Sequence, residues 1–213
     1  MINTERIEIC GLNILLHPHK ALYIPEESTL VVSDLHLGKI EHFRKNGLAV
    51  PLGTTQKTII RLHQLIEHFE PLRVVFLGDL FHSEYNRAID EFKYYLEEMK
   101  HINYILVKGN HDILHDDTYT TLNIYGVNAL DIGQLVLTHE AVTIDGKYNI
   151  HGHVHPAVRM KSKSRQQTTL SCFIFSEKYA VMPAFGQFTG KFIVKPKQGD
   201  TVFVVFNDAI MKV

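Results

Sequence analysis

Side chains that can bind a metal ion follow five separate apolar runs of the chain. The seven residues at the ends of these runs are Asp34, His36, Asp79, Asn110, His139, His153 and His155. The carboxyl ends of the strands form the ligand-binding edge of an open α/β sheet. If each apolar run is a strand, the seven side chains are expected to meet at one place.

The spacing within two of the motifs supports this convergence. Asp34 and His36 are two residues apart, as are His153 and His155. Residues two apart in an extended chain project to the same side, so each pair is expected to reach the same cluster. Glycine stands shortly before a ligand in three motifs and allows a close backbone approach. These glycines are Gly78, Gly109 and Gly152.

The donor set comprises two carboxylates, one amide oxygen and four imidazoles. It is too large for one tetrahedral zinc and lacks the thiolates of a structural site. It suits two divalent ions that are bridged by a carboxylate and keep open positions. Such a pair clamps an in-line phosphoryl displacement and lowers the pKa of a shared water. Mixed nitrogen and oxygen ligands favour Mn²⁺, Fe²⁺ or Zn²⁺ over Ca²⁺ or Mg²⁺.

The first half of the chain predicts the strands and helices that would position these ligands. Apolar runs at 29–33, 72–77 and 103–107 are typical of buried strands, and apolar residues recur at helical spacing over 53–69 and 86–99. This βαβαβ order implies parallel strands with helices packed on the sheet.

The second half is predicted to be rich in strands, without a long helix. Strand-like runs occur at 122–127, 134–138, 147–150, 168–175, 179–182 and 201–206. We expect Thr54 or Thr55 to cap the first helix. The whole chain, 1–213, is interpreted as one mixed α/β domain without a separate cap domain.

The composition is that of an ordinary globular protein and narrows the classes of partner. Among 213 residues, 45% are hydrophobic and 21% charged, and the net charge is −1. A basic surface covering the whole protein is therefore excluded, so any contact with nucleic acid must be local. Two cysteines, Cys10 and Cys172, cannot form a disulfide framework and are expected to be buried. No signal peptide or membrane span is visible, which predicts a cytoplasmic location.

The ordered motifs over residues 34–155 resemble those of calcineurin-like metallophosphoesterases. The resemblance implies a four-layer αββα sandwich, with two mixed central sheets flanked by helices. It implies one ion held by Asp34, His36, Asp79 and His155. It implies a second ion, bridged to the first by Asp79, that is held by Asn110, His139 and His153.

The same resemblance assigns roles to residues beside these ligands. His111 would protonate the leaving oxygen and contact the phosphate, and Asp112 would orient His111. His82, three residues after Asp79, is interpreted as a residue that contacts substrate or supports a ligand; the alternative is an exposed loop histidine. Glu140 could equally orient a ligand or cap the next turn.

A narrower resemblance is to the ligase-associated DNA damage response endonuclease (PdeM) family. It rests on segments 34–39, 43–47, 51–53, 78–82, 151–156 and 182–190. One departure is Leu170-Ser171-Cys172-Phe173, where that family has Leu-Pro-Cys-Phe. The family context implies a bacterial protein acting beside an ATP-dependent DNA ligase, a helicase and an exonuclease.

Two basic stretches are candidates for contact with a nucleic acid, although each could equally be an ordinary solvated surface. Arg159, Lys161, Lys163 and Arg165 alternate after the last metal motif, so a strand or hairpin would place them on one face. Lys39, Arg44 and Lys45 follow the first metal motif. Cations on phosphates give salt-dependent binding. The substrate-binding candidates are therefore Arg44, Lys45, Arg159 and Lys161.

The function hypothesis is a dinuclear phosphodiesterase, a DNA endonuclease acting in repair, with Mn²⁺ as the favoured metal. Its expected mechanism is attack of a metal-bridging hydroxide on phosphorus. One alternative is a metallophosphoesterase for a small phosphodiester or nucleotide. The intervals between Asn110, His139 and His153 leave no room for an enclosing helical lid, so an open site suits a polymer. A non-catalytic scaffold is disfavoured, because it would need no proton donor such as His111.

Overall fold

A seven-stranded mixed sheet forms one half of the computed structural model, which describes residues 4–39, 53–82, 85–161 and 167–213. In spatial order its strands are β1 (Glu5–Ile9), β2 (Leu12–His17), β3 (Ala21–Ile24), β4 (Thr29–Val32), β5 (Arg73–Leu77), β6 (Asn103–Val107) and β7 (Ile124–Val127). Neighbours from β1 to β4 are antiparallel, and neighbours from β4 to β7 are parallel. The parallel part contains the three strands that the first half of the sequence predicts.

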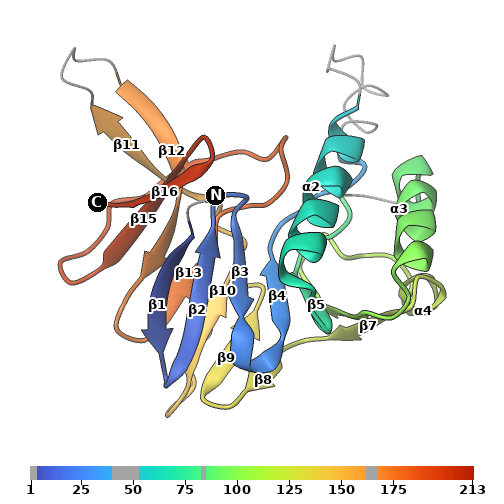
Figure 1. The fold of residues 1–213 in the computed structure, drawn as a ribbon, viewed down its shortest axis with the longest axis horizontal. Helices are drawn as coiled ribbons and strands as arrows, with labels where there is room; N and C mark the ends of the chain where they lie inside the picture. The colour runs from blue at the N-terminus through green and yellow to red at the C-terminus, as the bar shows by residue number, and fades with distance from the viewer. Residues whose placement is uncertain (1–3, 40–52, 83–84, 162–166) are drawn as a thin grey trace.

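The described α-helices lie together on one side of this first sheet (Figure 1). They are α2 (Thr54–Phe69), α3 (Arg87–Glu98) and α4 (Asp116–Thr121), and a short 3-10 turn, η1, covers Pro25–Glu27. Leu62 and Leu65 of α2 and Phe92 of α3 are buried in a cluster with β4 and β5 residues. This stripe of apolar residues at helical spacing fixes each helix on the sheet.

The second sheet is formed by the later strands of the chain. They are β8 (Leu130–Ile132), β9 (Leu135–Thr138), β10 (Tyr148–His151), β11 (Pro156–Lys161), β12 (Gln167–Phe175), β13 (Tyr179–Val181), β14 (Phe192–Ile193), β15 (Thr201–Phe206) and β16 (Ala209–Lys212). Parallel pairs join β10 to β9 and to β13, and antiparallel pairs join β12 to β11, β13 and β15.

The two sheets pack face to face through alternating side chains. Val31 and Val75 point into a core shared with Leu137 and Ile150 of the second sheet, whereas Phe76 points to the helices. Alternation of this kind is what a strand buried on both faces requires. The prediction of two mixed sheets with flanking helices is confirmed.

The carboxyl ends of β4, β5 and β6 lie at one edge of the first sheet, because these strands are parallel. Strands β9 and β10 are also parallel to each other and end together. All five apolar runs that precede a predicted ligand are therefore strands, with bounds close to the expected ones.

Two local predictions were wrong. Helix α2 begins after Gly53, which has a left-handed backbone, and neither Thr54 nor Thr55 caps it with its side chain. Cys10 is exposed in the turn between β1 and β2, although Cys172 is buried as expected. A glycine can take the left-handed conformation at low cost, which explains why it replaces the expected threonine at the helix start.

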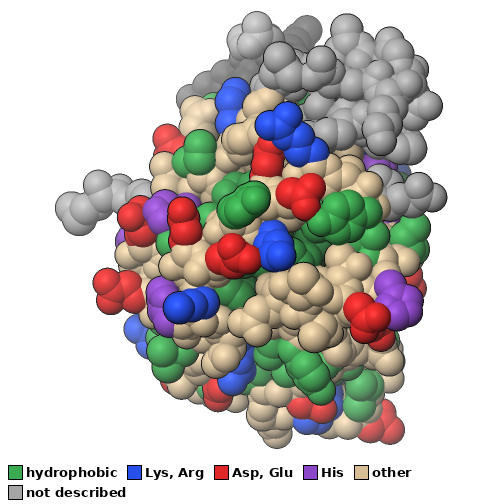
Figure 2. Space-filling model, turned by 90° about the vertical axis from the view of Figure 1, so that its right-hand side faces the viewer, with side chains coloured by type: hydrophobic (Ala, Val, Ile, Leu, Met, Phe, Trp, Pro, Cys, Tyr) green, Lys and Arg blue, Asp and Glu red, His purple; other side chains and the backbone are tan. Residues whose placement is uncertain are grey.

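The surface on the helical side carries charges of both signs. On the helical side of the molecule, lysine and arginine side chains lie among acidic ones (Figure 2). Within the described ranges, none of the helices combines the length and the apolar character that crossing a bilayer requires.

Candidate metal centre

The loop after β4 brings Asp34 and His36 to the edge of the sheet. Both residues have left-handed backbones, with φ of 54° and 47°. Their backbone N–H groups donate to the carbonyls of Gly78 and Asp79 in the neighbouring loop, at 3.1 and 2.9 Å. The expectation of an extended segment is therefore wrong here: two left-handed residues, not strand alternation, orient both side chains. Such conformations are costly for most residues and cluster at functional sites.

The first group of candidate ligands consists of Asp34, His36 and His155, whose ligand atoms lie within 4.8 Å of one another. His155 Nε2 is 3.1 Å from Asp34 Oδ1, and His36 Nε2 is 3.6 Å from Asp79 Oδ2. Asp34 is fully buried and His36 is 6% exposed. The contact between His36 and Asp79 places the Asp79 carboxylate beside this first group, although Asp79 belongs to the second group described next.

The second group consists of Asp79, His139 and His153, again within 4.8 Å. His139 Nε2 is 3.4 Å from Asp79 Oδ1, 3.0 Å from His153 Nδ1 and 3.2 Å from Asn110 Oδ1. The backbone N–H of His153 donates to the Asp34 carboxylate of the first group at 3.1 Å. The seven predicted ligands therefore converge, and the two groups lie next to each other, in contact through Asp79 and Asp34.

The hydrogen bond of His139 to the backbone turns its other ring nitrogen towards the second group. Its Nδ1 donates to the carbonyl of Leu77 at 3.1 Å, because a carbonyl can only accept. Its Nε2 faces the oxygens of Asp79 and Asn110. A metal-binding histidine commonly donates its other ring N–H to a backbone carbonyl in this way, and imidazole, carboxylate and amide atoms are all metal ligands, so these residues fit a metal ion.

The first group fits a metal ion on a second observation. Neither ring nitrogen of His36 has a hydrogen-bond partner, although both atoms are buried. A buried polar atom without a partner is costly, and a metal ion would satisfy it. Burial, followed by the charge of Lys39, lowers the pKa of His36 to about 3. The ring is therefore neutral, which is the form that binds a metal.

The carboxylate of the first group is ionised. Burial alone would raise the pKa of Asp34, but His155 and the Ser33 hydroxyl outweigh this effect and lower it. Ser33 Oγ donates to this carboxylate and lies 3.2 Å from the carbonyl oxygen of Leu77. Ser33 was not predicted from the sequence; the available signal was its position directly before Asp34 at the end of an apolar run.

The three predicted glycines allow the loops to approach one another closely. A Cβ on Gly78 would overlap the ring of His139, and one on Gly109 would lie 2.6 Å from the Asp79 backbone nitrogen. A Cβ on Gly152 would lie 2.6 Å from an oxygen of Asp34. The ligands reach their positions only because these side chains are absent.

His111 and His82 lie beside the first group. Their rings stack with centroids 5.1 Å apart, and they lie 5.3 and 5.5 Å from the ring of His36. The backbone N–H of His111 donates to Asp79 Oδ1 at 3.0 Å, which fixes this loop against a ligand. His111 is half-buried and therefore accessible from solvent.

The carboxylate of Asp112 accepts hydrogen bonds from backbone N–H groups. Its two oxygens accept from the N–H groups of Asp79, Leu80 and Gly109 at 2.8, 3.0 and 2.8 Å. Burial raises its pKa to about 6, with a contribution from Asp79. These bonds hold together the loops that carry Asp79 and Asn110, so any effect of Asp112 on His111 runs through the shared loop.

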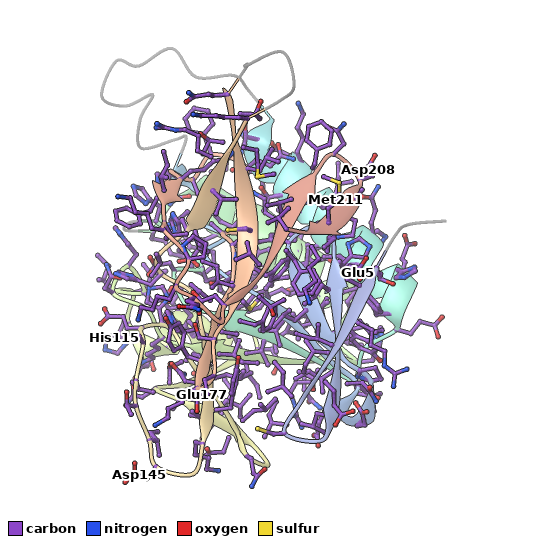
Figure 3. All side chains as sticks on the ribbon, turned by 90° about the vertical axis from the view of Figure 1, so that its left-hand side faces the viewer. Glu5, His115, Asp145, Glu177, Asp208 and Met211 are labelled. Carbon is purple, nitrogen blue, oxygen red and sulfur yellow. The ribbon has the colours of Figure 1, made fainter. Side chains whose placement is uncertain are left out.

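The remaining candidates are more peripheral. Arg159 and Lys161 are exposed on β11, whose first residue follows His155 directly. This hairpin extends from the end of the molecule that carries Asp208 and Met211, away from Asp145 (Figure 3). Glu140 is exposed, and its carbonyl accepts from Thr138 Oγ1 at 2.6 Å. Arg44, Lys45, Lys163 and Arg165 lie outside the described residues.

Comparison with known proteins identifies the class. The family model for the calcineurin-like phosphoesterase matches residues 28–206, and the chain belongs to this family. It is therefore a hydrolase of phosphoesters. No protein in the curated set matches the sequence.

The solved structures narrow the comparison. The crystal structure of Pseudomonas putida nuclease MPE is 27% identical, with a TM-score of 0.84, and the match covers 99% of this chain and 100% of that one. Yfce, a phosphoesterase from E. coli, is 15% identical with a TM-score of 0.42, over 85% and 90% of the two chains. The match to a nuclease along the whole chain agrees with the PdeM-like resemblance.

Proposed function

We propose that this phosphoesterase is a DNA endonuclease with two divalent ions, Mn²⁺ being the favoured metal. The observation that carries the proposal is the convergence of two ligand groups around Asp79, in a chain similar over its length to a nuclease. The cytoplasmic location, the single-domain organisation and a role in repair beside a ligase, a helicase and an exonuclease stay predictions.

The ligands have a defined division of labour in this proposal. Asp34, His36 and His155 hold one ion, His139, His153 and Asn110 hold the other, and Asp79 lies between them. Ions in these positions supply Lewis-acid polarisation of the phosphoryl group and a water of lowered pKa. The protein contributes fixed positions, because the left-handed loops and their hydrogen bonds hold the ligands before substrate binds.

His111 is the proposed general acid for the leaving oxygen. It is accessible, lies beside both groups and is held by its backbone bond to Asp79. A positioned acid contributes on the order of 10²- to 10⁴-fold to the rate. His82, stacked on His111, is proposed to limit the movement of that ring.

Hydrolysis of bis(p-nitrophenyl) phosphate with Mn²⁺ tests both the phosphodiesterase activity and the role of His111 as general acid. The wild type should turn over this diester, and His111→Ala should lose activity by at least about a hundredfold. His115→Ala, which changes an exposed histidine nearby in sequence, is the matched control. Equal activity of wild type and His111→Ala would overturn the assignment of His111.

A panel of circular and linear DNA, single- and double-stranded, tests the substrate class. The proposal expects nicking of circular DNA with Mn²⁺, since an endonuclease needs no free end. Good turnover of the small diester without cleavage of any DNA would replace the endonuclease with an esterase for small phosphodiesters.

The exposed cations of β11 are proposed to bind the DNA backbone. Arg159→Glu with Lys161→Glu should weaken DNA binding and reduce its salt dependence while small-diester hydrolysis persists. Lys178→Glu with Lys212→Glu is the matched control. Both lysines are exposed, and they lie on other parts of the second sheet, directly before β13 and at the end of β16. Equal loss of both activities in the β11 variant would show that these cations do not act on DNA.

A further inference from the structure

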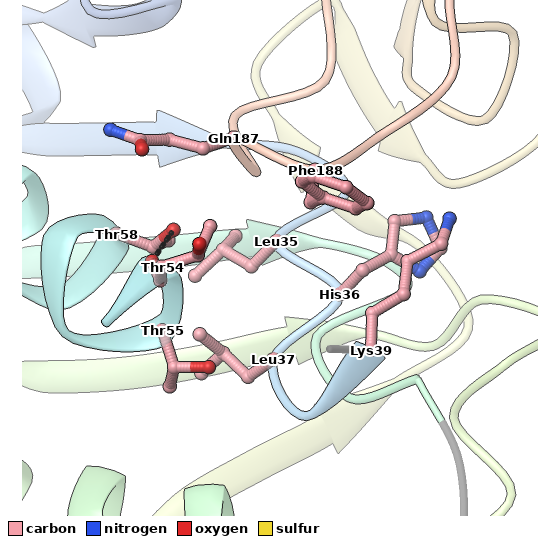
Figure 4. Close-up of a pocket in the computed structure, with 9 residues that line it drawn as sticks. All are labelled: Leu35, His36, Leu37, Lys39, Thr54, Thr55, Thr58, Gln187 and Phe188. Atoms are coloured by element: carbon pink, nitrogen blue, oxygen red, sulfur yellow. Dashed lines mark hydrogen bonds between the residues drawn. The ribbon is translucent and has the colours of Figure 1, made fainter. Parts of the chain in front are cut away.

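An exposed aromatic ring lies beside the first ligand group. Phe188 is 43% exposed and lines a small pocket of about 10 Å³ together with His36 and Lys39 (Figure 4). Single exposed hydrophobic residues are common on protein surfaces, so exposure alone means little. The position of this ring, next to a candidate metal ligand, is what calls for an explanation.

The segment that carries Phe188 is fixed to the loop that carries the ligands. The backbone N–H of Phe185 donates to the Ser33 carbonyl at 2.7 Å, and that of Gly186 donates to the Asp34 carbonyl at 3.1 Å. A Cβ on Gly186 would lie 3.0 Å from the Asp34 carbonyl, so the two backbones are in close contact. Thr189 Oγ1 donates to the Gly186 carbonyl at 3.1 Å and closes the turn.

A second anchor holds the same segment from the helical side. The guanidinium of Arg61 in α2 donates to the Phe185 carbonyl and lies 4.2 Å from the centroid of the Phe185 ring. Phe185 itself is fully buried. The segment is thus held at both Phe185 and Gly186, two residues before the exposed ring, and little ordering of its backbone is needed on binding.

The surroundings of the ring are complementary to a nucleotide, which carries an anionic phosphate and an apolar base. The Lys39 ammonium interacts electrostatically with Asp79 and Asp34, and Lys39 lines the same pocket as Phe188 and His36. A phosphodiester bound at the metal centre would meet cations there and an apolar aromatic face to one side. Among phosphodiesters, a nucleotide strand offers a flat π-surface next to each phosphate, and base–aromatic stacking is tolerant of base identity.

We infer that Phe188 is a stacking surface for a nucleobase that flanks the scissile phosphodiester. The inference rests on the proposed function and adds a recognition element to it. The base lies on the outer face of the ring, because the pocket behind the ring has room for about one water molecule. Phe188 is therefore a positioning residue that acts on substrate binding rather than on the chemical step.

Kinetics with a defined oligonucleotide test the stacking. Phe188→Leu keeps an apolar side chain but loses the ring face, so KM should rise about ten- to a hundredfold while kcat changes less than about threefold. Phe188→Tyr keeps the face and should restore the wild-type KM. An oligonucleotide with abasic positions beside the cleaved bond should show the high KM with wild type and no further loss with Phe188→Leu.

A spectroscopic readout separates stacking from a structural role. The chain contains no tryptophan, so Phe188→Trp introduces a single tryptophan, whose fluorescence can be excited apart from that of the tyrosines. In a His111→Ala background that slows turnover, an oligonucleotide should quench its fluorescence, whereas an abasic oligonucleotide of equal charge should not. Tyr94→Trp, at a position 70% exposed on α3, is the matched control and should respond to neither.

The outcomes distinguish the two proposals. Normal DNA cleavage with an unchanged KM in Phe188→Leu, or equal quenching by the base-bearing and abasic strands, overturns the stacking inference and leaves the proposed function standing. A wild type that neither binds nor cleaves oligonucleotides, yet hydrolyses the small diester, overturns both.

Discussion

Two clusters of histidines lie at the same edge of the first sheet, and only one has the composition of a metal site. His36 follows β4, and His17 ends β2, which runs in the same direction because both strands are antiparallel to β3. Both rings are buried, and in both burial lowers the pKa to about 3. Burial and a perturbed pKa are therefore shared by a candidate ligand and by a histidine outside the site.

The neighbours make the difference. His36 is surrounded by Asp34, Asp79 and three imidazole rings, whereas the ring neighbours of His17 are His19, His68 and Phe69. Besides burial, the groups that lower the pKa of His17 are the bases His19, His68 and Arg61. A dication needs anionic ligands to offset its charge, so the carboxylates, rather than the histidines, define the site.

The largest expected effect comes from removing the carboxylate that the two ligand groups share. Asp79→Asn should lower diester hydrolysis by about a thousandfold or more, since metal polarisation is worth several kcal/mol and 1.36 kcal/mol is tenfold in rate. The measurement is initial rate with Mn²⁺ at saturating diester. Asp145→Asn, an exposed change far from the site, should retain full activity. A loss of less than tenfold in Asp79→Asn would contradict a shared role.

Metal-dependent stabilisation compares the two clusters directly. A hundredfold excess of Mn²⁺ over its Kd should stabilise the wild type by about 2.7 kcal/mol, which raises Tm by about 5–10 °C. His36→Ala should lose most of this shift, whereas His17→Asn should keep it. Differential scanning fluorimetry with and without Mn²⁺ measures both. An equal loss in the two variants would mean that the cluster around His17 also binds the metal.

The packing of the ligand loops can be tested at a glycine. Gly78→Ala should destabilise the protein by about 1–3 kcal/mol and displace His139, because its Cβ overlaps that ring. Gly133→Ala is the matched control: its φ is also positive, at 57°, but no atom lies within 4 Å of its Cβ. Denaturant unfolding gives the difference, which is expected to favour Gly133→Ala. Equal destabilisation would show that backbone conformation alone sets the cost.

The smallest expected effect is the pH dependence that arises from His17. Its pKa is lower in the folded protein than in the unfolded chain, so its contribution to stability is present above pH 6.5 and is lost as pH falls towards 3. His17→Asn removes the titration but keeps an acceptor for the backbone N–H of His19. Between pH 7 and pH 5 the wild type should lose more stability than the variant, by at most about 2 kcal/mol and less to the extent that solvent screens the ring. Parallel stability curves would contradict this.

The position of the candidate metal centre could be predicted because strand ends are a property of topology. Alternating βα units place Asp34, Asp79 and Asn110 at one edge whatever the details of the loops. Most of the later strands were visible as apolar runs with turns between them, but the short strands β8, β14 and β16 were not predicted. The first three strands of the sheet were missed, since β1 alternates polar and apolar residues and is half-buried, and β3 has only four residues.

The details of the site depend on contacts between distant segments and could not be predicted. Nothing local shows that Asp34 and His36 are left-handed, because the cause is hydrogen bonding to the loop after β5. Asp112 was predicted to orient His111, but its carboxylate bonds to three backbone amides that only the folded loops bring together. Phe188 was part of a family-like segment, and its place beside His36 emerged only from the packing of that segment on Ser33 and Asp34.

Anomalous diffraction from crystals soaked in Mn²⁺ would locate the ions themselves. Two neighbouring peaks are expected, one among Asp34, His36 and His155 and one among Asp79, His139 and His153, with the Asp79 carboxylate between them. A single peak, no peak, or a peak beside His17 instead would contradict this expectation.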